Sequence, residues 1–313
     1  MPQCCVVYTT DDRYLFPTLV SAIQARHHTS PGAADVVIYC IDLSSEAERV
    51  FAPLCAKENL GLVSVNSKDV EGQNAMLARF FLNRFVPAQY SQYLYLDGDV
   101  HIFDALDPLI EAGVPEGHFL AANDPMTFLI PDPGAQSRDL SSHLEKLGLS
   151  RQQALCYFNS GVLRIHSNGW ETIGLKAWEH CRRTGKPSRF PDQDALNVVA
   201  ADKRLPMSLA WNFPVFMRNS RVESSIKPKI THFMSNPKPW HGSFPPWTPV
   251  AYKPYADALN KYPALEPFST VMPLRRRAAY QFQQHGKKIF ESLTWGFSEK
   301  RVRILSYEAS CPL

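Results

Sequence analysis

The stretch that decides the fold is Tyr93–Val100, YLYLDGDV, in which an apolar run ends in two carboxylates separated by a glycine. Asp-Gly between apolar runs is a strong β-hairpin signal, because its type I′ turn requires positive φ at both central residues. A metal site is the alternative. In an extended chain, Asp97 and Asp99 point to the same side and offer two oxygen ligands to one divalent cation. Gly98 would then leave room for a ligand near the backbone.

The preceding segments favour the metal site. Strands are expected over residues 4–9, 35–41, 62–65 and 93–96, with helices over 16–25, 44–58 and 76–85 between them. Strands separated by helices indicate βαβ units and an α/β fold with a mostly parallel sheet. The run YLYL is apolar throughout, as expected of a central strand. Ligands bind at the carboxyl ends of such strands, where Asp97 and Asp99 lie.

Further along the chain, the patterns predict more helices and one more strand. The expected elements are a loop over 132–137, a helix over 141–149, a strand with an internal turn over 157–165, and helices over 170–182 and 192–200. Residues 237–254 are dense in Pro and Trp, which disfavours regular structure there. We divide the chain into a catalytic domain, residues 1–250, and a basic, aromatic C-terminal extension, residues 251–313.

The composition is that of an ordinary globular protein: 313 residues, 45% hydrophobic and 20% charged. The net charge of +3 is too small to indicate a nucleic-acid partner. Basic residues concentrate between Arg275 and Arg303, where they alternate with aromatic ones. Such segments can lie on anionic lipid, so we expect either peripheral membrane contact or a solvated helix packed on the domain.

The cysteines and the absence of targeting signals bear on location. The seven cysteines form no C-x-x-C pair, which favours free thiols in a reducing compartment. We find no signal peptide and no apolar run long enough to span a bilayer. The expectation is a cytoplasmic protein, with peripheral contact at the inner face of the membrane if the extension binds lipid.

Five blocks in order resemble the retaining glycosyltransferases of family eight, which include bacterial lipooligosaccharide galactosyl- and glucosyltransferases and glycogenin. The resemblance covers roughly residues 3–241, and the blocks are VYTTDDRY (7–14), YLYLDGDV (93–100), YFNSGVL (157–163), PDQDALN (191–197) and THFMSNPKPW (231–240). It implies a GT-A fold, Rossmann-like, with a UDP-sugar donor and a divalent cation, Mn²⁺ or Mg²⁺.

The resemblance also implies roles for individual residues. Asp97, Asp99 and His232 would hold the metal, although His232 has a purely structural alternative at a strand end. Lys238 would meet a phosphate. Arg79 matches a basic position that approaches the donor, with a solvated helix charge as the alternative.

The end of the first strand corresponds to the family's uridine site. Thr9, Thr10 and Asp11 would lie against the nucleotide together with Gly98, and Asp11 could accept a hydrogen bond from the uracil N–H. The alternative is that an aspartate here caps the following helix. Of the two neighbours, Asp12 is the one we expect to cap.

The sugar pocket is expected to use Asp124, Asn159, Asp192 and Gln193, because carboxylates and amides bind sugar hydroxyls well. We expect one of Asp192 and Asp194 to face the sugar and the other to cap the helix. Gln193, with Asp192, is the predicted catalytic residue beside the anomeric carbon. An amide is a poor nucleophile, which favours a front-face route in which Gln193 gives electrostatic support.

The predicted function is metal-dependent transfer of glucose or galactose from a UDP-sugar to a glycan or lipid-linked glycan, in bacterial surface-polysaccharide synthesis. A cation between two phosphates lets the diphosphate leave without being protonated. One alternative is a catalytically silent module that binds UDP-sugar or glycan. Another is a nucleotidyltransferase, but the Gly- and Lys/Arg-rich loop common in that class does not follow the first strand.

Overall fold

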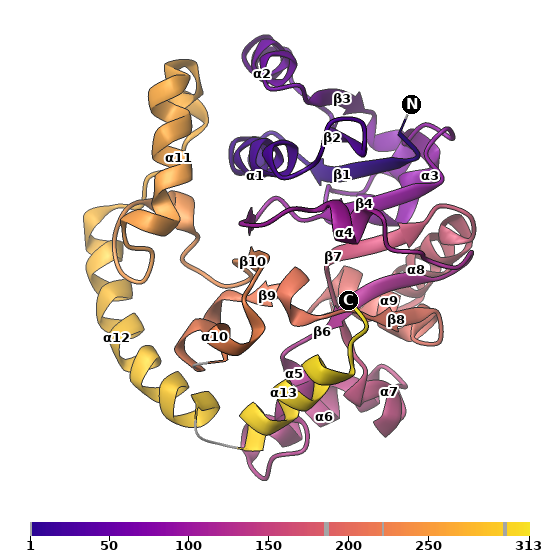
Figure 1. Ribbon diagram of the computed structural model, residues 1–313, viewed down its shortest axis with the longest axis vertical. Helices are drawn as coiled ribbons and strands as arrows, with labels where there is room; N and C mark the ends of the chain where they lie inside the picture. Colours follow the sequence, from indigo (N-terminus) through magenta and orange to yellow (C-terminus); the bar gives the residue numbers. More distant parts are fainter. Residues whose placement is uncertain (1, 185–187, 221, 297–298) are drawn as a thin grey trace.

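The computed structural model describes residues 2–184, 188–220, 222–296 and 299–313 (Figure 1). Its centre is a seven-stranded sheet with the order β3-β2-β1-β4-β7-β6-β8. The strands are β1 (Cys4–Thr10), β2 (Ala34–Ile41), β3 (Gly61–Val65), β4 (Gln92–Leu96), β6 (Phe119–Asn123), β7 (Phe158–His166) and β8 (Arg204–Pro206). All neighbours run parallel except β7, which is antiparallel to β4 and β6. The predicted α/β fold with a mostly parallel sheet is confirmed.

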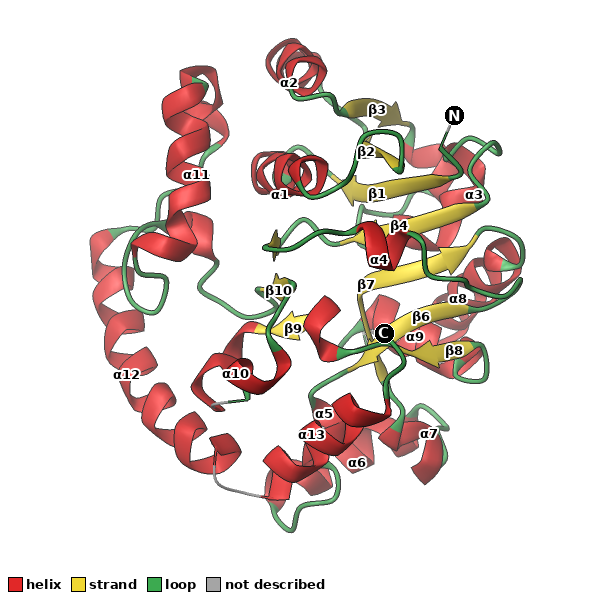
Figure 2. Ribbon diagram, in the orientation of Figure 1, coloured by secondary structure: helices red, strands yellow, loops and turns green. Residues whose placement is uncertain are grey.

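Helices cover both faces of this sheet (Figure 2). Cys4, Val6 and Tyr8 of β1 point into one hydrophobic core, and Cys5 and Val7 point into the other, as expected for alternating residues of a buried strand. The first core is closed by α1 (Leu15–His27), α2 (Ser45–Lys57) and α11 (Pro249–Lys261), and the second by α3 (Leu82–Phe85), α8 (Trp170–Thr184) and α9 (Pro191–Ala200).

The hairpin interpretation of YLYLDGDV is wrong. β4 is paired on both edges, by β1 and β7, and has no edge free for β5 (Val100–Ile102). β5 instead pairs with β10 (Ile230–His232), and β9 (Phe213–Pro214) completes a separate three-stranded sheet. Asp97–Asp99 therefore connects two sheets. The β5–β10 register places His232 opposite Val100, next to Asp99.

Several local expectations differ from the structure. The helix expected over 76–85 is a 3₁₀ turn, η2 (Ala78–Phe81), followed by the single turn α3. β7 runs without an internal turn, and the irregularity is a register shift on its partner β6 between Ala121 and Asn123. α6 (Ala135–Lys146) starts inside the expected loop, and α11 starts inside the segment expected to be irregular, with a proline in its first turn.

The remaining helices are short except at the C-terminus. They are α4 (Asp107–Ile110), α5 (Met126–Leu129), α7 (Arg151–Leu155), α10 (Glu223–Ile226), α12 (Leu274–Gly296) and α13 (Glu299–Ser310), with 3₁₀ turns η1 (Ser67–Val70), η3 (Leu209–Trp211), η4 (Val215–Ser220), η5 (Pro239–His241) and η6 (Pro263–Phe268). α12 runs along one side of the molecule, and α13 returns to the sheet beside α5 (Figure 1). Of the helices in the described ranges, none is both long and apolar enough to cross a membrane.

Residues after position 250 share the main hydrophobic core. Tyr255, Leu265 and Ile304 are fully buried in the same cluster as Tyr8 of β1. The chain end is also tied down, because the Ser208 N–H donates to the carbonyl of Leu313 at 2.8 Å. The basic helical tail thus packs on the α/β domain along α11 and α13.

Candidate active site

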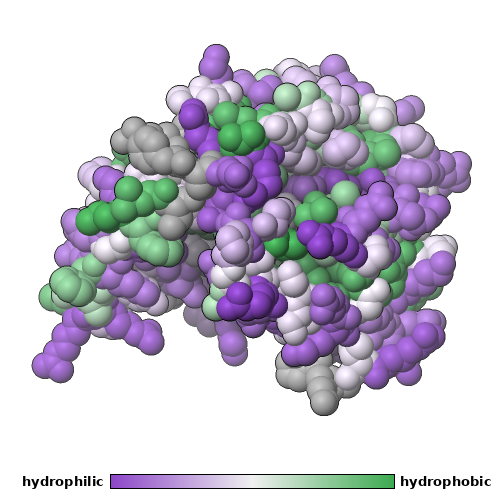
Figure 3. Space-filling model, turned by 90° about the horizontal axis from the view of Figure 1, so that it is seen from below, coloured by the Kyte–Doolittle hydropathy of each residue, from purple (hydrophilic) through white to green (hydrophobic). Residues whose placement is uncertain are grey.

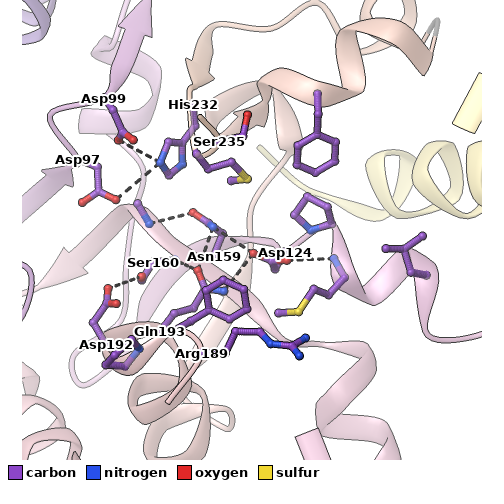
Figure 4. A pocket seen from close by; sticks show the side chains of 18 of the residues that line it. Asp97, Asp99, Asp124, Asn159, Ser160, Arg189, Asp192, Gln193, His232 and Ser235 are labelled. Carbon is purple, nitrogen blue, oxygen red and sulfur yellow. Dashed lines mark hydrogen bonds and ion pairs between the residues drawn. The ribbon is translucent and has the colours of Figure 1, made fainter. Parts of the chain in front are cut away.

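Asp97, Asp99 and His232 converge where the two sheets meet (Figure 4). The backbone N–H of Asp97 donates to the Gly161 carbonyl of β7 at 2.8 Å, which fixes the chain as it leaves β4. His232 Nε2 lies 3.2 Å from Asp99 Oδ1 and 3.7 Å from Asp97 Oδ2. One ligand atom of each residue lies within 4.8 Å of the other two, which is compatible with binding a single cation.

The orientation of His232 is set by Asn212, which follows η3. The Asn212 amide donates to Asn159 Oδ1 at 2.9 Å, so its carbonyl oxygen faces His232 Nδ1 at 3.0 Å. This network assigns the proton of His232 to Nδ1. The lone pair of Nε2 then faces the two aspartates, as in histidines that bind metals.

The two glycines beside the cluster have different roles. A Cβ on Gly161 would lie 2.2 Å from His232 Cε1 and 2.8 Å from Asp97 Oδ2, so only glycine lets β7 approach the cluster this closely. A Cβ on Gly98 would lie 2.2 Å from Thr18 Oγ1 of α1. The missing side chain of Gly98 therefore makes room for helix α1, and Gly98 also borders a cavity at the end of β1.

Arg79 in η2 is buried and joins two parts of the site. Its guanidinium lies 2.8 Å from Asp97 Oδ1 and 3.0 Å from Asp192 Oδ2, and it also donates to the Ser160 carbonyl at 2.8 Å. A buried arginine with two carboxylate partners is not the solvated helix charge considered as the alternative. Burial raises the pKa of Asp97 even though Arg79 acts in the opposite direction.

Lys238, just before η5, reaches the other carboxylate. Its Nζ lies 2.6 Å from Asp99 Oδ2 and donates to the Phe233 carbonyl, also at 2.6 Å. Burial acts to raise the pKa of Asp99, but the charges of Lys238 and His232 outweigh it, and the pKa is lowered well below its usual range. The structure thus places a cation directly beside the predicted metal ligand.

A second group of polar side chains, Asp124, Asn159 and Gln193, lies near the Asp97, Asp99 and His232 cluster. Asp124 Oδ2 accepts hydrogen bonds from the side-chain amides of Asn159 at 3.1 Å and Gln193 at 3.0 Å. Asn159 also donates to Gln193 Oε1 at 2.9 Å, which closes a triangle of hydrogen bonds. All three side chains are buried, and burial raises the pKa of Asp124. The predicted sugar-binding residues are therefore brought together and held rigidly.

Asp192 and Asp194, both in the first turn of α9, have different partners. Asp192 bonds Ser160 Oγ at 2.9 Å and Arg79, so it faces the site. Asp194 accepts from the Phe190 N–H at the start of α9 and from Tyr157 Oη at 2.5 Å, so it holds the helix in place.

A large cavity of about 720 Å³ opens onto both groups. Its walls come from the residues that follow β4, from the start of β7, the end of β10 and the start of α9, and from α12 and α13. Figure 4 draws many of the lining side chains. It contains Asp97, Asp99 and His232 as well as Asp124, Asn159, Asp192 and Gln193.

A separate cavity of about 500 Å³, here called the first-strand cavity, lies at the carboxyl end of β1. Thr9, Thr10 and Asp11 line it together with Gly98, and it shares Met76, Arg79, Asp97 and Asp99 with the large cavity. The two cavities therefore meet at the aspartates that follow β4, which is the position expected for ligands in an α/β sheet.

The first-strand residues have internal partners. Thr9 Oγ1 bonds Tyr95 Oη at 2.9 Å, and Thr10 Oγ1 accepts from Thr18 at 3.2 Å. Asp11 Oδ1 accepts from the backbone N–H groups of Arg13 and Tyr14 at 3.1 and 3.2 Å. Asp11, and not Asp12 as expected, thus holds the turn before α1.

Sequence reasoning missed three residues of the site. Asn212 orients His232, Ser160 bridges Arg79 and Asp192, and Tyr95 Oη donates to Asp97 Oδ1 at 3.2 Å. Ser160 lies inside the YFNSG block, and Tyr95 lies in the strand that leads to Asp97. The sequence around both residues could therefore have indicated that they belong to the site. No sequence pattern indicated Asn212, because it meets His232 only through the pairing of β9 with β10.

Comparisons with known proteins identify the family. Residues 5–243 match the model of glycosyl transferase family 8. Lipopolysaccharide glucosyltransferase WaaO of Escherichia coli (strain K12) is 24% identical over 94% of this chain and 90% of its own length.

Solved structures share the fold. The galactosyltransferase LgtC, determined in complex with donor and acceptor sugar analogues, superposes with a TM-score of 0.63 over 88% of this chain and 99% of its own, at 21% identity. The apo structure of the bifunctional glycosyltransferase WbbM gives a TM-score of 0.65 over 91% of this chain and 52% of its own, at 16% identity. Since the family model spans three quarters of the sequence and the two aspartates, His232 and the amide triangle all fall inside it, the chain belongs to glycosyl transferase family 8.

Proposed function

We propose that this protein transfers glucose or galactose from a UDP-sugar to a glycan acceptor with retention of configuration. One observation carries the proposal: the first-strand cavity and the large cavity share Asp97 and Asp99. A nucleotide in the first and a sugar in the second would place the diphosphate between them, at these carboxylates. The relationship to a lipopolysaccharide glucosyltransferase supports a role in bacterial surface-polysaccharide synthesis.

The residues present suit a divalent cation such as Mn²⁺ or Mg²⁺. Asp97 and Asp99 supply hard oxygen ligands, and His232 is held with Nε2 toward them. A Cβ on Gly161 would displace His232 and Asp97, so glycine at this position preserves the cluster. When bound, the cation would neutralise charge on the departing diphosphate.

Other residues would bind and position the donor. Lys238 lies beside Asp99 and offers a positive charge to a phosphate. Asp124 and Asn159 present oxygens and an amide suited to sugar hydroxyls. Arg79 holds Asp97 and Asp192 in fixed positions, and preorganised groups of this kind lower the cost of reaching the transition state.

Gln193 is the proposed residue beside the anomeric carbon. Its Oε1 accepts from Asn159 and from the Ser160 N–H at 3.2 Å, while its Nε2 donates to Asp124. A fully hydrogen-bonded amide is a weak nucleophile, which supports a front-face route in which Gln193 contributes electrostatically and Asp192 assists.

The test is release of UDP from a panel of UDP-sugars, with Mn²⁺ and with EDTA, by the wild type, Asp99→Asn and Gln193→Ala. We expect metal-dependent release from one donor, loss of that release in Asp99→Asn, and near-normal UDP binding with slow turnover in Gln193→Ala. Metal-dependent UDP binding without release, even with acceptor glycans, would instead indicate a silent binding module. Release of pyrophosphate from a nucleoside triphosphate would indicate a nucleotidyltransferase.

We further propose that the protein works in the cytoplasm and contacts anionic lipid through α12. Phe282, Ile289 and Leu293 lie on one side of that helix and are each more than 60% exposed. Hydrophobic side chains stand out on the side of the molecule where α12 runs, at the left of Figure 3. A nearby exposed cation, Arg275, would add attraction to an anionic surface. Replacing the three apolar residues by Ser should abolish sedimentation with vesicles containing phosphatidylglycerol, and leave UDP release intact.

A further inference from the structure

The C-terminal helices form one wall of the large cavity. The side opposite Asp124 is formed by Lys287, Phe290, Glu291 and Trp295 of α12 and by Lys300 of α13. These residues lie outside the segment that matches the family model, which ends at residue 243. The C-terminal helices therefore build a wall that the family match does not account for.

A second cavity adjoins the large cavity next to α12. An outer cavity of about 530 Å³ lies between α12, η4 and the loop at Trp247, and it shares Phe216, Ser235, Lys287 and Glu291 with the large cavity. Each cavity is within the range of about 300–1,000 Å³ typical of small-ligand sites. Two adjoining cavities accommodate a ligand longer than a single sugar ring.

The lining of this space suits carbohydrate with a negative charge. Phe216 borders both cavities, and its ring packs on that of Trp295 at the edge of the large cavity, with centroids 5.9 Å apart. The outer cavity contains the cations Arg218, Lys287 and Lys288 against the carboxylates of Glu223 and Glu291. Arg218 and Lys287 are paired with these glutamates, at 4.0 and 3.5 Å. Among the described residues, no carboxylate lies within 4.0 Å of the Lys288 ammonium.

The two sides of α12 serve different purposes. Gln284, Lys287, Glu291 and Trp295 recur at intervals of three and four residues, so they share one face of the helix, and that face borders the cavities. The exposed apolar residues Phe282, Ile289 and Leu293 are seven and four positions apart, which places them together on the opposite face. Binding in the cavities is thus separable from contact with lipid.

We propose that the acceptor is an oligosaccharide that carries a phosphate or carboxylate group. Its terminal sugar lies in the large cavity near Gln193, and its charged part lies in the outer cavity at Lys288. This inference rests on the proposed glycosyl transfer, and it makes α12 a determinant of acceptor specificity. Phosphate and carboxylate oxygens form charge-assisted hydrogen bonds with lysine, which accounts for the preference.

The test compares deacylated lipopolysaccharide core oligosaccharide before and after enzymatic dephosphorylation. Calorimetric binding is measured with the full-length protein in the presence of UDP and Mn²⁺, for the wild type, Lys288→Gln and Lys68→Gln. Lys288 is suitable because neutralising it leaves no carboxylate without its partner. Lys68, exposed in η1, borders none of these cavities and is the matched control.

We expect the wild type and Lys68→Gln to bind the phosphorylated oligosaccharide roughly tenfold more tightly than the dephosphorylated one. Lys288→Gln should lose that preference and bind the dephosphorylated form normally. Equal binding of both forms by the wild type, binding of neither, or an equal loss for both in Lys288→Gln would overturn the proposal. So would a Lys288→Gln variant that binds both oligosaccharides normally and loses only its binding to vesicles. UDP release by the same samples separately reports on the proposed transferase activity.

Discussion

Asn212 is the residue on which the orientation of His232 depends. It touches neither cavity, and its oxygen faces His232 Nδ1 at 3.0 Å. Partners of this kind typically contribute about 10–100-fold to metal affinity. We therefore expect Asn212→Ala to raise the Mn²⁺ concentration needed for half-maximal UDP release by about tenfold or more, while release at saturating Mn²⁺ remains measurable.

Asn83→Ala is a suitable comparison for this variant. Asn83 also donates an amide hydrogen bond, to the Ser167 carbonyl at 3.1 Å, but it borders neither cavity. Its Mn²⁺ dependence should equal that of the wild type. Should Asn212→Ala show the same Mn²⁺ dependence as Asn83→Ala, His232 would not require this partner for its role.

Gly161 has no room for a side chain beside His232 and Asp97. An added Cβ would have to displace His232 and Asp97 by about an ångström, and such a shift can cost about 100-fold in rate. Gly161→Ala should therefore lose metal-dependent UDP release by about that factor. Gly113→Ala, with nothing within 4 Å of the new Cβ, should stay close to wild type. Equal activity of the two variants would mean that the cluster adapts more freely than its packing indicates.

At the residue level, the sequence was most informative where a side chain follows a strand directly. Asp97 and Asp99 could be predicted because YLYL has the composition of a buried strand. The double ion pair of Arg79 could not, because it depends on how η2 packs beneath β4 and α9. The prediction that Asp12, and not Asp11, would cap the first helix failed for a similar reason. The Asp12 side chain accepts a hydrogen bond from the Ser44 N–H before α2, a contact across 32 residues.

Among the elements, strands buried on both faces were predicted well and short helices poorly. β1, β2 and β4 are continuous apolar runs, a pattern set by burial alone. η2 and α3 together span eight residues, too few for a helical period to be distinguished from a turn. The pairing of β5 with β10 joins residues about 130 positions apart, and no local pattern reports such a contact.

Glu58, at the end of α2, links this helix to α11 and its following residue. It accepts hydrogen bonds from Lys261 at 2.5 Å and from Tyr262. Burial acts to raise the pKa of Glu58, but these two hydrogen bonds outweigh it and lower the pKa. A carboxyl group whose pKa is lower in the folded state adds stability above its unfolded pKa of about 4.3, and that stability is lost as pH falls through the folded pKa.

Glu58→Gln should therefore reduce the free energy of unfolding by about 1–2 kcal/mol at pH 7, a value kept low because Lys261 is half-exposed. The difference in the free energy of unfolding between Glu58→Gln and the wild type should be constant above about pH 5 and shrink at lower pH. Urea unfolding between pH 3.5 and pH 8 measures both. Glu116→Gln, at an exposed loop position, should show no difference at any pH. If the loss of stability in Glu58→Gln were the same at pH 3.5 as at pH 7, it would be due to altered packing and not to the charge of Glu58.

For the whole molecule, the C-terminal helices are part of both the core and the site. The composition of residues 251–313 indicated a basic segment suited to a surface, and the exposed apolar side of α12 agrees with that pattern. It did not indicate that Tyr255 and Ile304 fill the main core or that Trp295 borders the large cavity. Aromatic residues in a basic helix can contact a membrane or pack into the protein core, and only the tertiary contacts distinguish these two cases.

Tyr307 of α13 connects the end of the chain to the sheet. Its hydroxyl donates to the Met207 carbonyl at 2.7 Å and accepts from the Asn123 N–H at 3.0 Å and from Arg204 at 2.8 Å. Asn123 is buried at the end of β6, directly before Asp124. Tyr307→Phe keeps the ring and leaves the Asn123 N–H without its partner, which costs about 1–3 kcal/mol.

The expected result for Tyr307→Phe is a lower thermal midpoint with a single cooperative transition, because α13 and the sheet unfold together. UDP release well below the midpoint should be retained, since the hydroxyl touches no residue of the proposed metal or sugar sites. Tyr280→Phe on α12 is the matched control and should leave the midpoint unchanged. If instead Tyr307→Phe unfolds at the wild-type temperature, α13 is not held against β6 in solution. Its residue Lys300 would then contribute no fixed wall to the proposed acceptor side of the large cavity.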